Sequence, residues 1–308
     1  MKNRIYYFAI IILLILFAYF SYQIIIGVRP LRIVFLDVGQ GDSILIQKGS
    51  RQILIDGGPS GKVELAKLGK YLPYFDREIE IVIATHPDKD HIAGLIEAAR
   101  NYKIDKILAT AAEKDTQVFK EWREVLDYNK IETLEVWRGT EIKFDDANMK
   151  VLYPAGKVDP SVGEANDKSV VARLDYGENS FLFTGDIESG AEKEILESRE
   201  NVDIDFLKIA HHGSKYSSSE EFLDAASPEE AVISVGKNNS YGHPTEAVLE
   251  ALKKRNVKVF RTDEKGDIIF ECKNQKSKCK MTSNLAGVRF ASSKTQNYCW
   301  QRPILGRF

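Results

Sequence analysis

The stretch IEIVIATHPDKDHIAGL, Ile79–Leu95, joins an apolar run to a turn in which two histidines and two aspartates fall within six residues. The apolar run predicts a buried strand, and the residues after the turn predict a helix. The four side chains of the turn are those of His86, Asp88, Asp90 and His91. Nitrogen and oxygen donors without thiolate suit zinc, manganese or iron, so the turn is predicted to form half of a metal site. The alternative is that Asp88 or Asp90 only caps the helix that follows.

The other histidines of the chain also come directly after predicted strands. His211 and His212 follow the strand in FLKIAHHGS, and His243 lies in VISVGKNNSYGHP. FLFTGD places Asp186 at the end of another buried strand, where a carboxylate is costly unless something positive, such as a metal ion, neutralises it. A helix cap is again the alternative for this aspartate. Because rigid strands fix where their last residues point, we expect these side chains to meet in one site.

Strands and helices alternate in two β-rich halves. The first half opens with three predicted antiparallel strands within residues 31–58, and the second opens with a hairpin at residues 169–186. Helical periodicity marks residues 62–72, 92–102, 116–129, 187–198, 218–226 and 245–255. Two β-rich halves with helices outside predict an α/β fold, a four-layer αββα sandwich.

Six motifs in a fixed order resemble a known family. They are FLDVGQGDS, ILIDGG, THPDKDHIAGL, FLFTGD, LKIAHHGS and SYGHPT. The set resembles the metallo-β-lactamase-fold hydrolase domain that forms the C-terminal part of ComEC-type DNA-uptake proteins, and it covers nearly all of a domain at residues 31–271. The resemblance implies an αββα sandwich with two divalent metal ions, zinc or manganese, at one edge of the sheets.

The resemblance also assigns roles to individual residues. The implied metal ligands are His86, Asp88, Asp90, His91, Asp186 and His211. The implied catalytic residues are Asp90, Asp186 and His243, and the residues that support the ligands or contact substrate are Asp56, Asn166, His212 and Ser214. Asp88 stands where the wider superfamily has a second histidine, which favours manganese as a competitor to zinc. His212 and His243 stay open between ligand, substrate contact and proton donor.

The implied function is a metal-dependent hydrolase, most specifically a phosphodiesterase or nuclease that uses a metal-activated water. Three alternatives remain open. The fold can also hydrolyse cell-surface phosphodiesters, it can hydrolyse carbon esters and lactones, or the chain can be a non-catalytic binding module that a metal stabilises. We expect a stand-alone hydrolase domain without the ComEC channel, and no protein partner can be inferred.

The N-terminal residues 1–30 contain 24 consecutive uncharged residues, Ile5–Val28. This length can cross a bilayer, so the pattern predicts a transmembrane anchor. A cleaved signal peptide and a buried helix are the alternatives. With the default orientation, the protein would be membrane-anchored and its body would lie outside the cytoplasm.

The C-terminal tail, residues 272–308, carries eight basic and no acidic side chains. Its aromatic residues are Phe290, Tyr298, Trp300 and Phe308. Basic and aromatic residues together favour DNA or another anionic phosphodiester polymer as partner, and a solvated tail is the alternative. All three cysteines lie here, and the short spacing of Cys272 and Cys279 permits a small disulfide loop.

Overall fold

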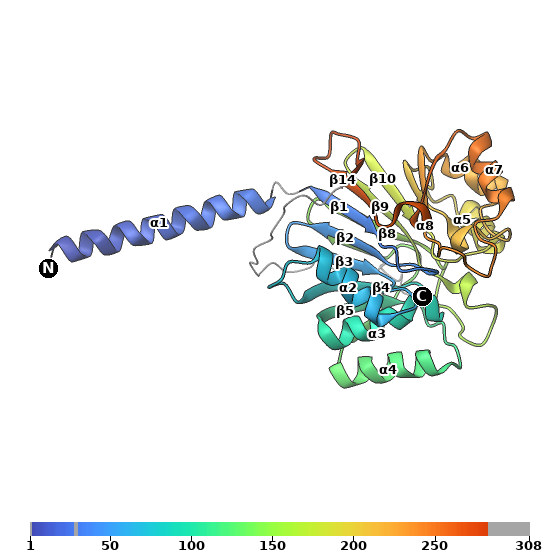
Figure 1. Cartoon of the computed structure of the whole chain (residues 1–308), viewed down its shortest axis with the longest axis horizontal. Coiled ribbons are helices and arrows are strands. Elements are labelled where there is room, and N and C mark those ends of the chain that lie inside the picture. Colours follow the sequence, from blue (N-terminus) through green and yellow to red (C-terminus); the bar gives the residue numbers. More distant parts are fainter. Residues whose placement is uncertain (1, 28–29, 283–308) are drawn as a thin grey trace, which may run out of the picture.

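The computed structural model describes residues 2–27 and 30–282 (Figure 1). In this part of the chain the strands form two sheets. The strands of the first sheet are β1 (Leu31–Phe35), β2 (Ile44–Lys48), β3 (Arg51–Ile55), β4 (Glu78–Ala84), β5 (Lys103–Ala109), β6 (Glu132–Glu135), β14 (Ile268–Cys272) and β15 (Lys280–Thr282). Their order across the sheet is β15-β14-β1-β2-β3-β4-β5-β6.

The second sheet has the order β13-β12-β11-β10-β9-β8-β7. Its strands are β7 (Glu141–Phe144), β8 (Ala147–Tyr153), β9 (Val171–Tyr176), β10 (Asn179–Phe183), β11 (Phe206–Lys208), β12 (Glu230–Ile233) and β13 (Lys258–Arg261). The predicted three-stranded antiparallel start, β1-β2-β3, and the predicted hairpin, β9-β10, are both present.

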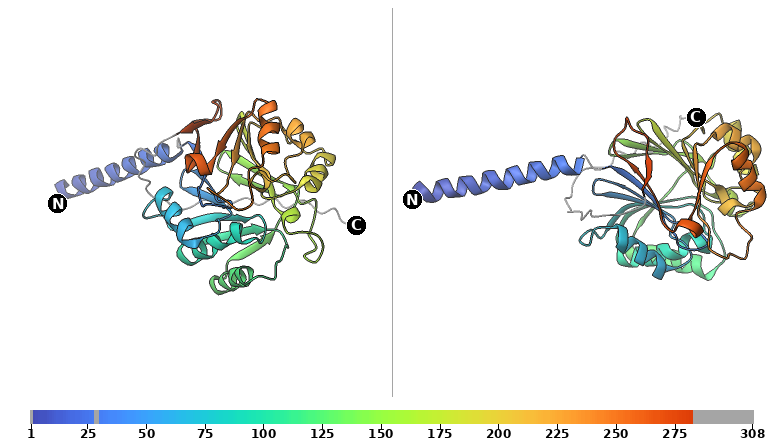
Figure 2. Two further views of the ribbon diagram at one scale, coloured as in Figure 1. Left: turned by 45° about the vertical axis from the view of Figure 1, so that its right-hand side comes forward. Right: turned by 45° about the horizontal axis from the view of Figure 1, so that its top comes forward.

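Helices cover the outer faces of both sheets (Figures 1 and 2). The helices over the first sheet are α2 (Gly61–Tyr71), α3 (Lys89–Asn101) and α4 (Gln117–Asn129). Those over the second are α5 (Ser189–Glu197), α6 (Glu220–Ala226) and α7 (Glu246–Lys254). The short α8 (Thr262–Lys265) links β13 to β14, and α1 covers Lys2–Gly27.

Three apolar cores separate these four layers. In β1, Ile33 and Phe35 pack between the two sheets, whereas Val34 packs under α2–α4. In β10, Phe183 faces the central core and Leu182 faces α5–α7. Side chains alternate between the faces of a strand, so both faces must be apolar in a sheet that is covered twice. The predicted αββα sandwich therefore follows from the apolar runs.

Strand direction decides where a site can form. Strands β3 to β6 run parallel to one another, and so do β10 to β13. Strand β1 runs in the direction of β3, because β2 is antiparallel to both. Parallel strands end at the same edge of a sheet, and ligand sites form beyond those carboxyl ends. The segments after β1, β3, β4, β10, β11 and β12 carry the six motifs quoted above.

The predicted transmembrane anchor requires a correction. A helix needs about 20 consecutive apolar residues to cross a bilayer. Within residues 2–27 and 30–282, no helix is both long enough and apolar enough to do so. This finding overturns the prediction of a transmembrane anchor and, with it, of a membrane-anchored body.

The start of the predicted tail belongs to the sheet. Strand β15 pairs with β14, and a disulfide joins Cys272 to Cys279 between these strands. Both cysteines are buried in the core between the sheets. The basic and aromatic residues that favour a nucleic-acid partner lie mostly at positions 283–308, outside the described residues.

Candidate metal centre

The site lies at the edge where the strands of both sheets end. Asp56 follows β3, His86 follows β4, and Asp90 and His91 lie in the first turn of α3. The second sheet adds Asp186 after β10 and His212 after β11. Asp42, in the loop between β1 and β2, closes the site from the first sheet. All of these side chains are buried except that of Asp90, which is partly exposed.

Three histidine rings make a hydrogen bond through Nδ1 and have no hydrogen bond at Nε2. The Thr85 hydroxyl donates its only proton to Asp56. It lies 3.0 Å from His86 Nδ1 and can therefore only accept a hydrogen bond from that nitrogen. His91 Nδ1 lies 2.8 Å from Asp56 Oδ2, and His212 Nδ1 lies 2.8 Å from the Ser234 carbonyl oxygen. The Nε2 atoms of His86, His91 and His212 are buried and have no hydrogen-bond partner. A carboxylate or carbonyl on the far nitrogen is how proteins orient a histidine that binds a metal.

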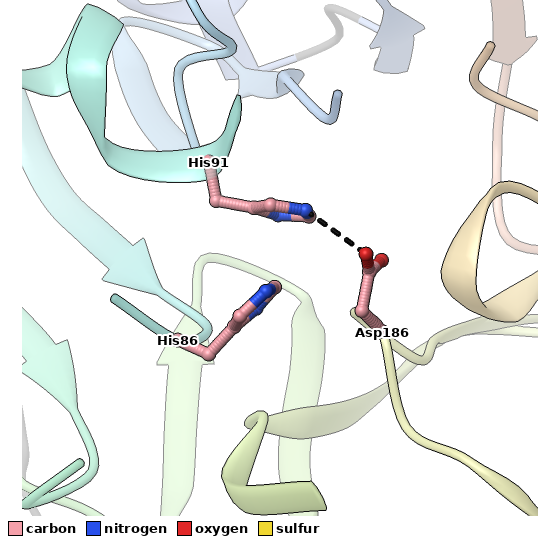
Figure 3. Close-up of side chains that lie close together, drawn as sticks. All are labelled: His86, His91 and Asp186. Atoms are coloured by element: carbon pink, nitrogen blue, oxygen red, sulfur yellow. Dashed lines mark ion pairs between the residues drawn. The ribbon is translucent and has the colours of Figure 1, made fainter. Parts of the chain in front are cut away.

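The unpartnered nitrogens converge on two carboxylates. Asp186 Oδ2 lies 3.2 Å from His91 Nε2 and 3.3 Å from His212 Nε2, and Figure 3 shows Asp186 opposite the rings of His86 and His91. Asp90 Oδ2 approaches His212 Nε2 to 3.5 Å. We call the set His86, Asp90, His91, Asp186 and His212 the inner cluster. Single donor atoms from His86, His91 and Asp186, or from Asp90, His91 and His212, all lie within 4.8 Å of one another.

The electrostatics of the inner cluster also fit a cation. Burial opposes the charged form of His91, but the carboxylates of Asp186 and Asp56 outweigh it and raise the pKa of this histidine. His212 is also buried, and Asp186 and Asp90 raise its pKa to about 9. For His86, burial dominates and lowers the pKa. A divalent ion would satisfy the negative potential that protonates His91 and His212, and it would displace their protons as it bound. The donor set therefore fits one or two divalent metals.

Lys208 provides a fixed positive charge beneath the inner cluster. The side chain is fully buried in β11, and its Nζ forms an ion pair with Asp42. It also donates to the Gly185 carbonyl oxygen at 2.9 Å and lies 3.4 Å from Asp186 Oδ1. Asp186 thus turns one oxygen toward the lysine and the other toward the histidines. The ammonium holds the carboxylate in the orientation that the cluster needs.

His211 and His212 lie in a strained turn. Both histidines and Gly213 have left-handed φ angles, of 48°, 54° and 84°. Such conformations cost about 1–3 kcal/mol each in residues other than glycine and persist at functional sites where the surroundings enforce them. A Cβ on Gly213 would lie 2.6 Å from Pro244 Cβ, so only glycine fits here. The turn directs His212 into the inner cluster.

His211 lies outside that cluster. Its Nε2 is 3.4 Å from Asn166 Nδ2, and its Nδ1 is 3.5 Å from Glu188 Oε1. The sequence assigns a ligand role to His211 and leaves His212 undecided, whereas the geometry brings His212 to the carboxylates.

The remaining predicted site residues surround the inner cluster. Asp88 precedes α3, and both of its oxygens lie 2.7 Å from Lys114 Nζ, so its charge is paired outside the cluster. Ser214 is buried and closes the turn, because its N–H donates to the His211 carbonyl oxygen and its hydroxyl accepts from the Tyr216 N–H. Asp56 accepts from Thr85 and His91 and so fixes the start of α3.

Sequence reasoning missed several parts of this arrangement. Lys208 is the single cation in the otherwise apolar segment FLKIA. A lysine in such a segment indicates a buried partner of opposite charge. Thr85 contacts His86 through its hydroxyl, and Ser234 contacts His212 through its main-chain oxygen. No spacing of residues in the sequence predicts such contacts. Asp42 lies in a motif, but its pairing with Lys208 spans the two sheets.

Comparison with known families agrees with the geometry. The profile of the Metallo-beta-lactamase superfamily matches residues 36–237. The ComE operon protein 3 of Bacillus subtilis (strain 168) is 32% identical over 263 residues, which cover 78% of this chain and 33% of that protein. The competence protein ComA of Neisseria gonorrhoeae is 31% identical over 235 residues, 76% of this chain and 31% of that protein. The chain thus spans about a third of the length of these relatives, and the ComEC-like resemblance is confirmed.

Among solved structures, the metallo-beta-lactamase fold protein YhfI from Bacillus subtilis superposes with a TM-score of 0.54. The sequences are 16% identical, and the match covers 79% of this chain and 99% of that one. At this identity the likeness shows the fold alone.

Proposed function

The chain belongs to the metallo-beta-lactamase superfamily, whose members are typically metal-dependent hydrolases, and we propose that it hydrolyses phosphodiesters in nucleic acid. One observation carries the proposal. Three buried histidines present unpartnered Nε2 atoms to the carboxylates of Asp90 and Asp186. A folded protein rarely leaves several buried polar atoms without a hydrogen bond in one place unless a ligand satisfies them.

Each residue of the inner cluster has a part in this chemistry. His91, His212 and Asp90 would hold one divalent ion, and His86 would hold a second beside it. Asp186 would help to hold the metal, because its Oδ2 faces His91 and His212 while Lys208 orients its other oxygen. When bound, the ions would supply an activated water and neutralise the negative charge that develops on the phosphate. Asp88 could join the second position only after it parts from Lys114.

His243 is the proposed proton donor to the leaving oxygen. Its ring lies 5.8 Å from that of His211, and its Nδ1 is buried without a hydrogen-bond partner. Burial, His211 and His212 lower the pKa of His243 in the free protein. The approach of an anionic phosphodiester acts in the opposite direction, because it favours the charged imidazole.

Nucleic acid is favoured as the substrate for two reasons. Two relatives are named Recombination protein 2, from Haemophilus influenzae, and competence protein ComA, from Neisseria gonorrhoeae. The tail of the chain also combines basic and aromatic residues, which suit a polyanion with flat bases. Zinc and manganese are the proposed metals, because the donors are imidazole and carboxylate without thiolate.

The test is cleavage of single-stranded and plasmid DNA by the purified chain with added zinc or manganese. We expect cleavage with at least one metal, and we expect elemental analysis to find bound metal in the wild type. Asp186→Ala should lose both, because this carboxylate faces two of the three histidines.

Asp115→Asn is the matched control, because this aspartate has a side chain 90% exposed and should change neither result. Hydrolysis of a carboxylic ester or lactone without DNA cleavage would reassign the substrate. A folded, metal-loaded protein that cleaves no phosphodiester would contradict the proposal.

A further inference from the structure

A row of aromatic rings leads from the inner cluster to the surface. The ring centroid of His212 lies 6.3 Å from that of His211, which lies 5.8 Å from that of His243. The ring of Tyr241 then stacks on His243, with centroids 6.0 Å apart and planes at 15°. Exposure rises along the row, from the buried His212 to Tyr241, which is 68% exposed. We call His211, His243 and Tyr241 the outer row.

The loop that carries the end of the row is held in shape. The Asn239 side chain accepts from the N–H groups of Tyr241 and His243, each at 3.1 Å. Its Nδ2 donates to the carbonyl oxygens of His243 at 2.7 Å and Gly236 at 3.1 Å. The Thr245 N–H donates to the Gly213 carbonyl oxygen at 2.9 Å, which joins this loop to the turn at His211 and His212. The exposed tyrosine therefore stands in a fixed position relative to the inner cluster.

A second exposed tyrosine lies on the other loop of this edge. Tyr216 is 58% exposed and follows the turn at His211 and His212 by a few residues. The Lys215 ammonium lies 5.0 Å from the centre of its ring. Lys237 is exposed on the loop that carries Tyr241. Both loops beside the metal centre thus offer a flat ring together with a cation.

We propose that the exposed face of Tyr241 is a stacking site for a nucleobase of a single-stranded substrate whose phosphodiester lies at the metal centre. This inference rests on the proposed function and adds a binding residue to it. Every base has an aromatic face, so stacking on a protein ring binds single strands with little sequence preference. A base in a duplex is already paired and stacked, and freeing it costs a few kcal/mol. The outer row therefore selects single strands.

The test compares two oligonucleotides of equal length. One carries bases, including the fluorescent base 2-aminopurine, and the other has a tetrahydrofuran unit in place of every base. We expect Tyr241→Ala to bind the strand with bases roughly 5- to 150-fold more weakly, the range for loss of one stacked base. Binding of the abasic strand should not change. Affinity is measured by 2-aminopurine quenching and, for both strands, by anisotropy of an end label, in chelator-treated protein so that cleavage does not interfere.

Two further variants show whether the ring itself is responsible. Tyr241→Phe keeps the ring and should bind both strands as the wild type does. Tyr74→Ala removes a tyrosine that is 79% exposed and lies before β4, at the opposite end of that strand from His86, and should also have no effect. In cleavage assays with metal, Tyr241→Ala should raise KM for the strand with bases and leave kcat unchanged.

The outcomes separate the two proposals. If the wild type cleaves neither strand with zinc or manganese, the proposed function fails. If it cleaves both and Tyr241→Ala treats them as the wild type does, or weakens both equally, only the stacking site is overturned.

Discussion

His211 and His212 are neighbours in the sequence, yet they belong to two regions with opposite properties. His212 joins the inner cluster, where each histidine ring is buried, has a hydrogen-bond partner on Nδ1 and has no hydrogen bond on Nε2. His211 begins the outer row, where the rings lie progressively nearer the solvent. The same side chain is thus prepared for a cation in one place and for contact with substrate in the other. Burial of the whole ring and the two carboxylates that face it, rather than residue type, distinguish His212 from His211.

The largest expected effect on the stability of the inner cluster comes from removal of the Lys208 ammonium. Lys208→Met leaves Asp42 and Asp186 buried without the ammonium that pairs with both. Removal of one partner of a buried pair costs about 3–5 kcal/mol, so we expect a loss of this size in the free energy of unfolding by urea. The loss should be smaller with bound metal, which also neutralises Asp186.

Lys150→Met is the control for this experiment. Lys150 pairs with Glu200 near the surface, where an ion pair contributes about 0–1 kcal/mol. Equal stability losses in the two variants would show that the buried ammonium has no special role.

A direct comparison of the two histidines sharpens the boundary between the regions. We expect His212→Ala to weaken metal binding by more than about 100-fold, because residues that merely support ligands already contribute 10- to 100-fold. His211→Ala should change the affinity by less than about 3-fold, since its ring faces Asn166 and Glu188. Calorimetric titration with zinc and manganese gives both values. The reverse order would restore the ligand role that the sequence assigns to His211.

A third comparison uses a buried carboxyl for which desolvation outweighs the attraction of the nearby Lys67. Glu64 in α2 is fully buried, and burial raises its pKa from 4.5 to about 8. The folded state therefore holds a proton that the unfolded state releases, so stability is complete below pH 4.5 and falls as the pH rises toward about 8. We expect a slope of about 1 kcal/mol per pH unit from this residue. Glu64→Gln should remove that slope.

Glu80 serves as the reference for this measurement. Burial also raises the pKa of Glu80 to about 8, so it adds a dependence of the same sign that Glu64→Gln leaves in place. Urea unfolding between pH 5 and 8 separates the two contributions when Glu80→Gln and the double variant are included. A wild type whose stability does not change over this interval would contradict both assignments.

The sequence determined the layers and the location of the site. Apolar runs long enough to be buried on both faces required two covered sheets, and the alternation seen in β1 and β10 follows from them. Histidines and aspartates directly after strands had to meet where parallel strands end. His86, Asp90, His91 and Asp186 could therefore be predicted as one group without any knowledge of the packing.

Only the tertiary structure decided which atoms of that group face one another. The left-handed turn at His211–Gly213 directs His212 inward because Pro244 packs against Gly213, a contact between residues 31 positions apart. Asp88 lies beside Lys114, and Asp42 beside Lys208, through contacts between different elements. Local spacing sets the face of an element on which a side chain lies. Its contact partner depends on how the elements pack. That packing therefore decides the charge of each histidine and which of its nitrogens is left without a hydrogen bond.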